Sequence, residues 1–346
     1  MRAARYTGPK TIETADVVVG EPAAGEVQLA VAYTGICGTD LHIYHGDMDA
    51  RVRRPAVIGH ECSATIAAVG DGVEGWSVGD SVTVLPVRSC GSCAACQAGF
   101  GHVCPQLVFL GIDATGAMQN RWNVPAQLLV RLPTEVNLRH AALVEPTAVA
   151  VHDVRRAGLA RGQHVVVVGG GPVGTLIAVV ARAAGADVSL VEVDGERRAL
   201  AAKLGFRVID PTSSDVTKEV FELTSSRGAD VAFEVSGSAG GVATAVDVLG
   251  VRGKLVMVAI HTQPREVNLH RFFWRELEMV GARLYERRDF EEAAALIASG
   301  VVPAEELISA VVPLDAAGEA FASLAHGGVM KVLVDCTEAG KGTDDV

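Results

Sequence analysis

The apolar positions of the chain follow one rhythm up to about residue 145 and a different one after it. In the first part, short Val-rich runs are separated by turns rich in Gly, Pro and Asp, and the clearest runs are Glu26–Val31, Ala64–Val69 and Ser81–Leu85. Short strands at such close spacing are typical of barrels and sandwiches. We therefore expect an all-β domain over the first ~150 residues.

From His164 onward, apolar runs of strand length alternate with helical stretches. His164–Val168 is a continuous apolar run, and Val173–Ala184 is a helical stretch that stops before a glycine. The alternation continues through a helix and further strands, expected in turn at Val188–Val193, Glu196–Leu204 (the helix), Asp230–Glu234, Gly253–Val258 and Glu278–Leu284. This order predicts a parallel sheet covered by helices on both faces. Two helices and a closing strand, Lys331–Val334, are expected after Asp289, and the pattern alone assigns them to neither domain.

Composition narrows the class of protein. The chain has 346 residues, of which 49% are hydrophobic and 21% charged, which suffices for two folded domains and excludes intrinsic disorder. A formal net charge of −11 would repel phosphate backbones and anionic lipids, so we expect neither a nucleic acid nor a membrane as a partner. Residues 1–10 lack a secretory signal, and glycines interrupt the most apolar stretch, Val165–Val180. We therefore expect a cytoplasmic protein.

A glycine-rich motif stands between the first strand and the first helix of the second part. Gly169, Gly171 and Gly174 have the spacing G-x-G-x-x-G, with Pro172 and Val173 between the last two. Glycines at this spacing allow a tight turn, a close approach of the backbone to a pyrophosphate and close packing of helix on strand. The helix N-terminus adds free N–H groups. The pattern is weak alone, but its place between a strand and a helix predicts a dinucleotide site.

Two acids at the end of the next expected strand compete for the cofactor ribose, Glu192 and Asp194. Because they are two residues apart, we expect both on one side of the strand, and spacing alone does not choose between them. A carboxylate here accepts hydrogen bonds from a ribose hydroxyl and repels a 2′-phosphate, which favours NAD over NADP. Arg197 and Arg198 are either alternative partners for a 2′-phosphate or part of a solvated helix face. We predict NAD.

A single loop contains four cysteines with the spacing C-x2-C-x2-C-x7-C, namely Cys90, Cys93, Cys96 and Cys104. Four thiolates in so short a segment suit a closed, tetrahedral structural zinc site. An iron–sulfur cluster and disulfides are the alternatives, but the long last gap is unlike a ferredoxin run. The total of seven cysteines, an odd number, indicates a reducing compartment. We predict structural zinc, with no role assigned to Cys62 and Cys336.

A second set of potential ligands is scattered along the first part and consists of Cys37, His60, Glu61 and Glu145. A thiolate, an imidazole and a carboxylate make a zinc site of catalytic type, with one position left for water or substrate. The spacing is a weak signal by itself. A lone Cys is more often a buried small hydrophobe, and a lone His more often a satisfied structural residue.

Five motifs taken together resemble the zinc-dependent medium-chain dehydrogenases/reductases of the alcohol dehydrogenase superfamily. They are CGTDLH at Cys37–His42, GHE at Gly59–Glu61, the four-cysteine loop, Glu145-Pro146 and GGGPVG at Gly169–Gly174. Their order and spacing follow the family from about residue 1 to Cys336. The Glu145-Pro146 pair is similar to the sorbitol and butanediol dehydrogenase branch, with threonine dehydrogenases nearby.

This resemblance implies an α/β fold of two domains. A GroES-like β-barrel catalytic domain would comprise residues 1–148 and 287–346, and a Rossmann domain with a doubly wound parallel sheet would comprise residues 149–286. The resemblance also implies a homodimer or homotetramer. Within the Rossmann domain it implies that Glu192 is the acid on the ribose and that Arg197 lies beside the adenosine ribose.

The resemblance further implies how the second ligand set works. Zinc held by Cys37, His60 and either Glu145 or Glu61 would act as a Lewis acid on an alcohol, whose hydride passes to the nicotinamide.

A proton relay belongs to the same implied mechanism. Thr39 and His42 would carry the proton to water together with the cofactor ribose, and Asp40 would orient His60. The plainer alternatives are that Thr39 caps a turn and that His42 is an exposed surface residue.

The expected function is therefore hydride transfer between a secondary alcohol, namely a polyol, diol or cyclitol, and NAD, with about two zinc ions per chain. A small-molecule alcohol is the expected partner. A 3-hydroxy amino acid, as in threonine dehydrogenases, is the alternative substrate. A non-catalytic dinucleotide-binding protein is the alternative from another class, since a fold does not imply a function. The complete set of ligand candidates favours the enzyme.

Overall fold

Two compact units make up the chain in a computed structural model that describes residues 1–134, 136–324 and 329–338. The first unit contains the described residues of Met1–Glu145, Glu286–Gly300 and the segment that begins at Ala304. The second contains Pro146–Tyr285 and Val301–Pro303. The expected domain boundaries lie after residues 148 and 286, and the boundaries in the structure lie after Glu145 and Tyr285. The short segment 301–303, expected in the first domain, belongs to the second unit.

The first unit is built on a mixed, mostly antiparallel sheet in the order β10-β6-β5-β3-β18-β17, with β9 also paired to β3. A second sheet has the order β2-β1-β4, and β7 pairs with β8. These strands are β1 (Arg2–Gly8), β2 (Thr11–Asp16), β3 (Glu26–Ile36), β4 (Ala56–Val57), β5 (Glu61–Val69), β6 (Ser81–Val84), β7 (Val87–Arg88), β8 (Val108–Phe109), β9 (Arg121–Pro125), β10 (Leu129–Arg131), β17 (Ile308–Pro313) and β18 (Lys331–Asp335). The expected β-barrel domain is confirmed.

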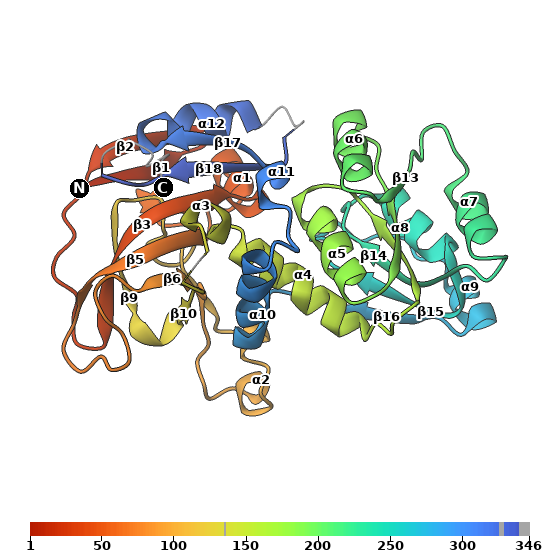
Figure 1. Cartoon of the computed structure of the whole chain (residues 1–346), viewed down its shortest axis with the longest axis horizontal. Helices are drawn as coiled ribbons and strands as arrows, with labels where there is room; N and C mark the ends of the chain where they lie inside the picture. Colours follow the sequence, from red (N-terminus) through yellow and green to blue (C-terminus); the bar gives the residue numbers. More distant parts are fainter. Residues whose placement is uncertain (135, 325–328, 339–346) are drawn as a thin grey trace. The chain divides into compact units, whose positions relative to one another are not determined.

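The strand β18 completes this sheet although it comes last in the chain. It pairs antiparallel with β3 and parallel with β17, so it lies between them (Figure 1). All five of its residues are buried. The pattern left this strand unassigned, whereas the resemblance placed it in the first domain, where it is found.

Helices also belong to the first unit. They are α1 (Gly38–His45), α2 (Ala94–Gln97), α3 (Leu138–Ala141), α10 (Arg287–Ala298), α11 (Ala304–Leu307) and α12 (Ala317–Leu324), with 3₁₀ turns at Gly101–Val103, Ala126–Leu128 and Leu314–Ala316. An all-β first domain was therefore too simple. The CGTDLH motif lies at the start of the helix α1, with Cys37 as its N-cap.

The second unit is a six-stranded parallel sheet in the order β13-β12-β11-β14-β15-β16. The strands are β11 (His164–Val168), β12 (Asp187–Val191), β13 (Arg207–Ile209), β14 (Ala229–Glu234), β15 (Leu249–Met257) and β16 (Glu278–Gly281). The helices are α4 (Val144–Ala157), which contains the boundary between the units, α5 (Pro172–Ala183), α6 (Gly195–Lys203), α7 (Val216–Leu223), α8 (Ala239–Asp247) and α9 (Leu269–Arg275). The expected Rossmann fold is confirmed.

Two strands end earlier than their hydrophobic patterns predict. β16 stops at Gly281, and Leu284, which the pattern included in the strand, has a φ of 57°, a left-handed conformation outside strand geometry. β12 stops at Val191, so Glu192 and Asp194 lie beyond it. The expectation that both acids share one side of a strand was therefore wrong, and each side chain has its own direction.

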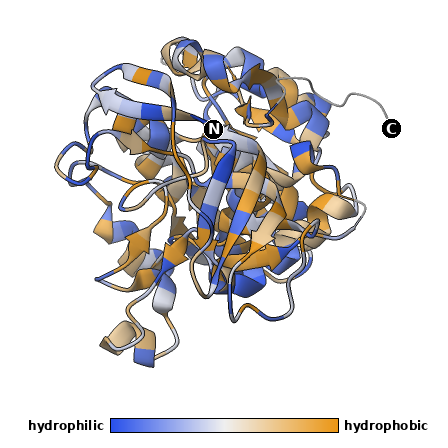
Figure 2. Ribbon diagram, turned by 90° about the vertical axis from the view of Figure 1, so that its left-hand side faces the viewer, coloured by the Kyte–Doolittle hydropathy of each residue, from blue (hydrophilic) through white to orange (hydrophobic). Residues whose placement is uncertain are grey.

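Hydrophobic and hydrophilic residues are interspersed along the strands and helices, as Figure 2 shows by colour. The core of the second unit includes Val166, Val191, Ala232 and Leu255 from four neighbouring strands, all of them at most 2% exposed. None of the helices in the described part of the chain has the length and apolar character that a membrane crossing requires.

Candidate functional site

The first cluster forms where β3 leads into α1. Cys37 caps the N-terminus of α1: its Sγ accepts the Thr39 backbone N–H at 3.2 Å, and its own N–H donates to Asp40 Oδ2 at 3.0 Å. His60 stands just before β5, and its Nε2 lies 3.0 Å from Cys37 Sγ. The capping bonds fix the direction of the thiol, and the neighbouring strands β3 and β5 bring the imidazole to it.

Asp40 stands behind His60. The carboxylate is fully buried, and its Oδ1 lies 3.7 Å from His60 Nδ1, the ring nitrogen that faces away from Cys37. Phe109 packs edge-on against the same imidazole with ring centroids 5.0 Å apart. Burial raises the pKa of the Cys37 thiol and also that of the Asp40 carboxyl. A cation beside Cys37 Sγ and His60 Nε2 would relieve this cost.

Glu61 lies next in the chain and faces a buried lysine. Lys331 Nζ is 2.7 Å from both Glu61 carboxylate oxygens and also donates to the Ile36 carbonyl at 3.3 Å. Burial alone would lower the pKa of Lys331, but the charge and hydrogen bond of Glu61, together with the charges of Cys37 and Glu145, outweigh it and raise that pKa. Gly35 leaves the room for this pair, since a Cβ there would lie 2.1 Å from Glu61 Oε2.

Glu145 is the remaining carboxylate of the predicted ligand set. It occupies the first turn of α4 and is 5% exposed. Its charge acts on both His60 and Lys331 and raises the pKa of each. The structure thus gathers Cys37, Asp40 and His60 into one cluster of the first unit, with potential ligand atoms within 4.8 Å of one another, and Glu145 acts on this cluster through its charge. Sulfur, imidazole and carboxylate together are a donor set that zinc takes.

The two residues of the predicted proton relay lie on α1. Thr39 is half-buried in the first turn, directly after the Cys37 cap. His42 is exposed in the last turn, and its Nδ1 lies 3.0 Å from Asp47 Oδ2. One helix therefore connects the buried cluster with the solvent.

The four-cysteine loop includes α2 and extends away from the strands of its unit (Figure 1). The Sγ–Sγ distances are 3.4 Å for Cys93–Cys96, 3.5 Å for Cys104–Cys90, 3.8 Å for Cys93–Cys104 and 3.9 Å for Cys90–Cys96. Tetrahedral zinc with Zn–S bonds of about 2.3 Å requires edges of about 3.8 Å. All seven cysteines belong to the described residues and are free. These separations suit one tetrahedral ion and leave no space for an iron–sulfur cluster.

The glycine-rich loop follows β11 and opens α5. Gly169 has a φ of 108°, and a Cβ on Gly174 would lie 1.8 Å from the Gly169 carbonyl oxygen. Gly171 is the N-cap of α5, Pro172 and Val173 begin the helix, and no side chain caps its N-terminus. The first N–H groups are thus left for an anion, as a pyrophosphate requires.

The two acids beyond β12 have separate tasks. Glu192 is 6% exposed and reaches the glycine loop, where Oε2 accepts the Gly170 N–H at 2.6 Å and Oε1 accepts the Asp194 N–H at 2.8 Å. Asp194 instead caps α6 by accepting the Arg197 N–H at 2.9 Å. The geometry therefore places Glu192, and not Asp194, beside the loop.

The two arginines of α6 also differ. The Arg197 guanidinium lies 3.6 Å from the position that a Cβ of Gly171 would take, and its buried Nε has no hydrogen-bond partner. Arg198 is held by Asp210 at 2.9 Å and by the Glu192 and Val193 carbonyls. Arg197 is thus the cation that faces the loop.

Lys331 is a site residue that the motif analysis missed. A lysine that opens an otherwise apolar closing strand was the available signal, because a charge in a buried strand requires a partner. Its partner, however, lies 270 residues earlier in the chain, so no local spacing connects the two.

Comparison with known proteins shows which family the chain belongs to. Residues 23–134 match the model of the alcohol dehydrogenase GroES-like domain, and residues 172–299 match that of the zinc-binding dehydrogenases. The chain is 47% identical, over 97% of its length and 99% of the relative, to 2-dehydro-3-deoxy-L-galactonate 5-dehydrogenase of Pseudoalteromonas atlantica. The chain belongs to the zinc-dependent medium-chain dehydrogenases/reductases.

Two further relatives place this dehydrogenase among enzymes of secondary alcohols. It is 33% identical to a sorbitol dehydrogenase of Halalkalibacterium halodurans, over 91% of this chain and 93% of the relative. The crystal structure of 2R,3R-butanediol dehydrogenase from Bacillus subtilis superposes with a TM-score of 0.90 at 32% identity, covering 96% of this chain and 99% of that one. The dehydrogenase is therefore an oxidoreductase of secondary alcohols that uses a dinucleotide cofactor and zinc.

The buried pair of Lys331 and Glu61 should govern the stability of the dehydrogenase. Lys331→Met is expected to lower the free energy of unfolding by about 3–5 kcal/mol, because it leaves a buried carboxylate without its partner. The double variant Glu61→Gln/Lys331→Met removes both charges and should recover most of the loss. Urea unfolding followed by circular dichroism measures both.

An exposed lysine supplies the control for this experiment. Lys218→Met breaks the solvent-exposed pair with Glu222, 3.9 Å apart, and should cost less than about 1 kcal/mol. A Lys331→Met protein that unfolds at the same urea concentration as Lys218→Met would contradict the prediction.

Proposed function

We propose that this dehydrogenase oxidises a secondary hydroxyl of a polyol or sugar acid with NAD as hydride acceptor. The observation that carries the substrate class is the 47% identity, over nearly the whole chain, to a dehydrogenase of the hydroxylated sugar acid 2-dehydro-3-deoxy-L-galactonate. The sorbitol and butanediol relatives support the same class of vicinal, hydroxyl-rich substrates.

The preference for NAD is supported by Glu192. Each of its carboxylate oxygens accepts one backbone N–H and keeps a second lone pair for a ribose hydroxyl. The buried negative charge would also repel a 2′-phosphate. Of the two arginines that could partner a 2′-phosphate, Arg198 is occupied by Asp210, whereas Arg197 faces the glycine-rich loop.

A catalytic zinc held by Cys37, His60 and Glu145 forms part of the proposal. When bound, the ion supplies Lewis acidity to the substrate hydroxyl. Glu145 is favoured over Glu61 because both Glu61 oxygens are engaged by Lys331. Asp40 lies behind the His60 ring, with its Oδ1 3.7 Å from Nδ1, where it would orient the imidazole so that Nε2 faces Cys37.

We also propose that α1 carries the proton released from the substrate to solvent. Thr39 is placed directly after the Cys37 cap, and the exposed His42 lies at the other end of the same helix. A hydroxyl near the reacting oxygen and an imidazole open to water are the groups that such a relay requires.

A substrate panel tests the function. Polyols, diols, cyclitols, sugar acids and 3-hydroxy amino acids are each incubated with NAD and with NADP, and absorbance of the reduced cofactor is followed. We expect turnover of polyols or sugar acids with NAD. Turnover of 3-hydroxy amino acids alone, or a clear preference for NADP, would contradict the proposed substrate class or the role of Glu192, respectively.

Zinc content tests the two metal sites. The purified chain should contain about two zinc ions, and Cys37→Ser and Cys93→Ser should each reduce this to about one. Cys62→Ser is the control, because burial raises the pKa of the Cys62 thiol to about 12 and keeps it protonated. Elemental analysis by mass spectrometry gives the ratio. Iron in place of zinc, or full zinc content in Cys37→Ser, would overturn the assignment.

The relay is tested by the pH dependence of the rate. His42→Ala should change the shape of the kcat profile across neutral pH, because it removes the solvent-facing acceptor of the proton. His45→Ala, at another exposed histidine of α1, is the control and should leave the profile as it is. Identical profiles for both variants would exclude the relay.

A further inference from the structure

A buried carboxylate at the end of β14 has no task in the function proposed so far. Glu234 is fully buried, and its Oε1 accepts the Ser236 N–H at 3.0 Å, the Ser236 Oγ–H at 2.5 Å and the Gly237 N–H at 3.0 Å. Its Oε2 faces His261 Nε2 at 2.9 Å. Glu234 therefore ties the turn after β14 to the loop after β15.

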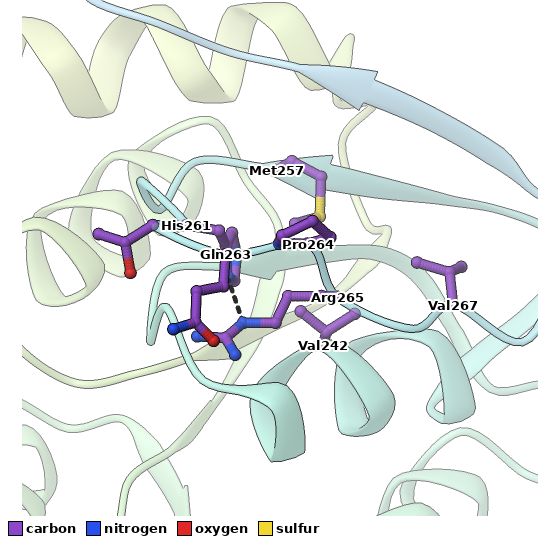
Figure 3. A pocket seen from close by; sticks show the side chains of 8 residues that line it. Val242, Met257, His261, Gln263, Pro264, Arg265 and Val267 are labelled. Atoms are coloured by element: carbon purple, nitrogen blue, oxygen red, sulfur yellow. Dashed lines mark hydrogen bonds between the residues drawn. The ribbon is translucent and has the colours of Figure 1, made fainter.

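His261 continues this connection to an arginine. Arg265 Nε lies 3.3 Å from His261 Nδ1, and another Arg265 nitrogen donates to the Gly237 carbonyl at 3.3 Å. The dashed line in Figure 3 marks the hydrogen bond between Arg265 and His261. Because a carboxylate accepts and a guanidinium donates, His261 has its proton on Nε2 and accepts at Nδ1. The single neutral tautomer thus bridges two opposite charges.

The connected segments border the glycine-rich loop. A Cβ on Gly169 would lie 2.9 Å from the Ser236 backbone nitrogen, so the turn after β14 packs directly against the first glycine of the motif. Residues 258–268 have no regular structure of their own. They form one wall of a cavity of about 480 Å³ whose lining includes Met257, His261 and Arg265.

The strand order shows which part of a dinucleotide these segments would meet. The order of the parallel strands reverses between β11 and β14, and a dinucleotide binds across such a reversal at the carboxyl ends of the strands. Glu192 follows β12 on one side of the reversal and is the acid for the adenosine ribose. Glu234 and His261 follow β14 and β15 on the other side, which leaves them the nicotinamide half.

We propose that Arg265, His261 and Glu234 form a positioning chain that holds the 258–268 loop in its cofactor-binding conformation at the nicotinamide half of the site. The inference rests on the dinucleotide-dependent function proposed above. An irregular segment that is already ordered loses less conformational entropy when a ligand binds to it. His261, which connects Glu234 with Arg265, keeps the 258–268 loop ordered in this way and does not contact the reacting atoms.

The test uses the full-length, zinc-loaded chain and two independent breaks in the positioning chain. His261→Leu and Arg265→Met should each raise the Kd for NADH about ten-fold, the cost of losing a hydrogen bond to a charged group. Arg265→Met leaves the bond between His261 and Glu234 intact. This variant therefore still tests the effect of the positioning chain on NADH affinity if His261→Leu folds poorly. Calorimetric titration gives the Kd, and steady-state assays should show a raised KM for NAD with kcat retained.

Two control variants separate positioning from general stability. His261→Gln can donate to Glu234 and accept from Arg265, so it should bind NADH nearly as the unmodified chain does. His164→Leu removes a histidine at the start of β11 that lies 3.2 Å from the Asp187 carboxylate. This position is at the amino ends of the parallel strands, opposite to the carboxyl ends where the dinucleotide would bind. This variant should lower stability without changing the Kd. Hydrogen exchange in residues 258–268 of the cofactor-free chain should rise in His261→Leu and in Arg265→Met, and should not rise in either control variant.

The outcomes separate the inference from the function on which it rests. Unchanged NADH affinity in both His261→Leu and Arg265→Met, or an equal loss in His164→Leu, would overturn the positioning chain and leave the dehydrogenase function standing. A parent chain that binds neither NADH nor NADPH would overturn both.

Discussion

A buried ion pair, Lys331 with Glu61, connects the parts of the first unit on which its chemistry depends. Glu61 opens β5 directly after His60, and Lys331 opens β18, so their contact spans the intervening strand β3, whose end leads to Cys37. Two charges withdrawn from water are costly singly and tolerable together. The thiol and imidazole therefore keep their 3.0 Å separation only while all three strands stay in register.

The second unit uses a different constraint, the close approach of backbones. Gly169 and Gly174 meet so tightly that no side chain fits between them, and the turn after β14 presses on Gly169 from outside. Buried carboxylates then complete the frame. Glu192 accepts backbone N–H groups from the glycine-rich loop and from Asp194, and Glu234, the last residue of β14, accepts those of the turn that follows it. The carboxyl ends of a parallel sheet thus become a fixed set of donors and acids rather than a group of loose loops.

Local spacing accounts for what could be predicted from the sequence. The four-cysteine loop and the glycine motif are each confined to one segment, so their geometry is contained in the order of the residues. The sequence alone could not assign the roles of Glu192 and Asp194, because both residues follow β12. The structure distinguishes them, since Asp194 caps α6 and Glu192 does not. Lys331 and His261 were missed for a related reason: each is defined by a partner in another strand or loop, which periodicity does not reveal.

The place of β18 has a consequence for the order in which the protein forms. Residues 331–335 are synthesised after every strand of the nucleotide-binding sheet, yet they lie between β3 and β17 in the other unit. During translation, all strands of the parallel sheet are synthesised before β18. Until β18 is made, β3 lacks its pairing with that strand and Glu61 lacks its ion pair with Lys331. A ribosome-bound chain would therefore contain a folded Rossmann unit and an incomplete barrel. At this stage the barrel exposes an unpaired strand edge, which a chaperone would shield from aggregation.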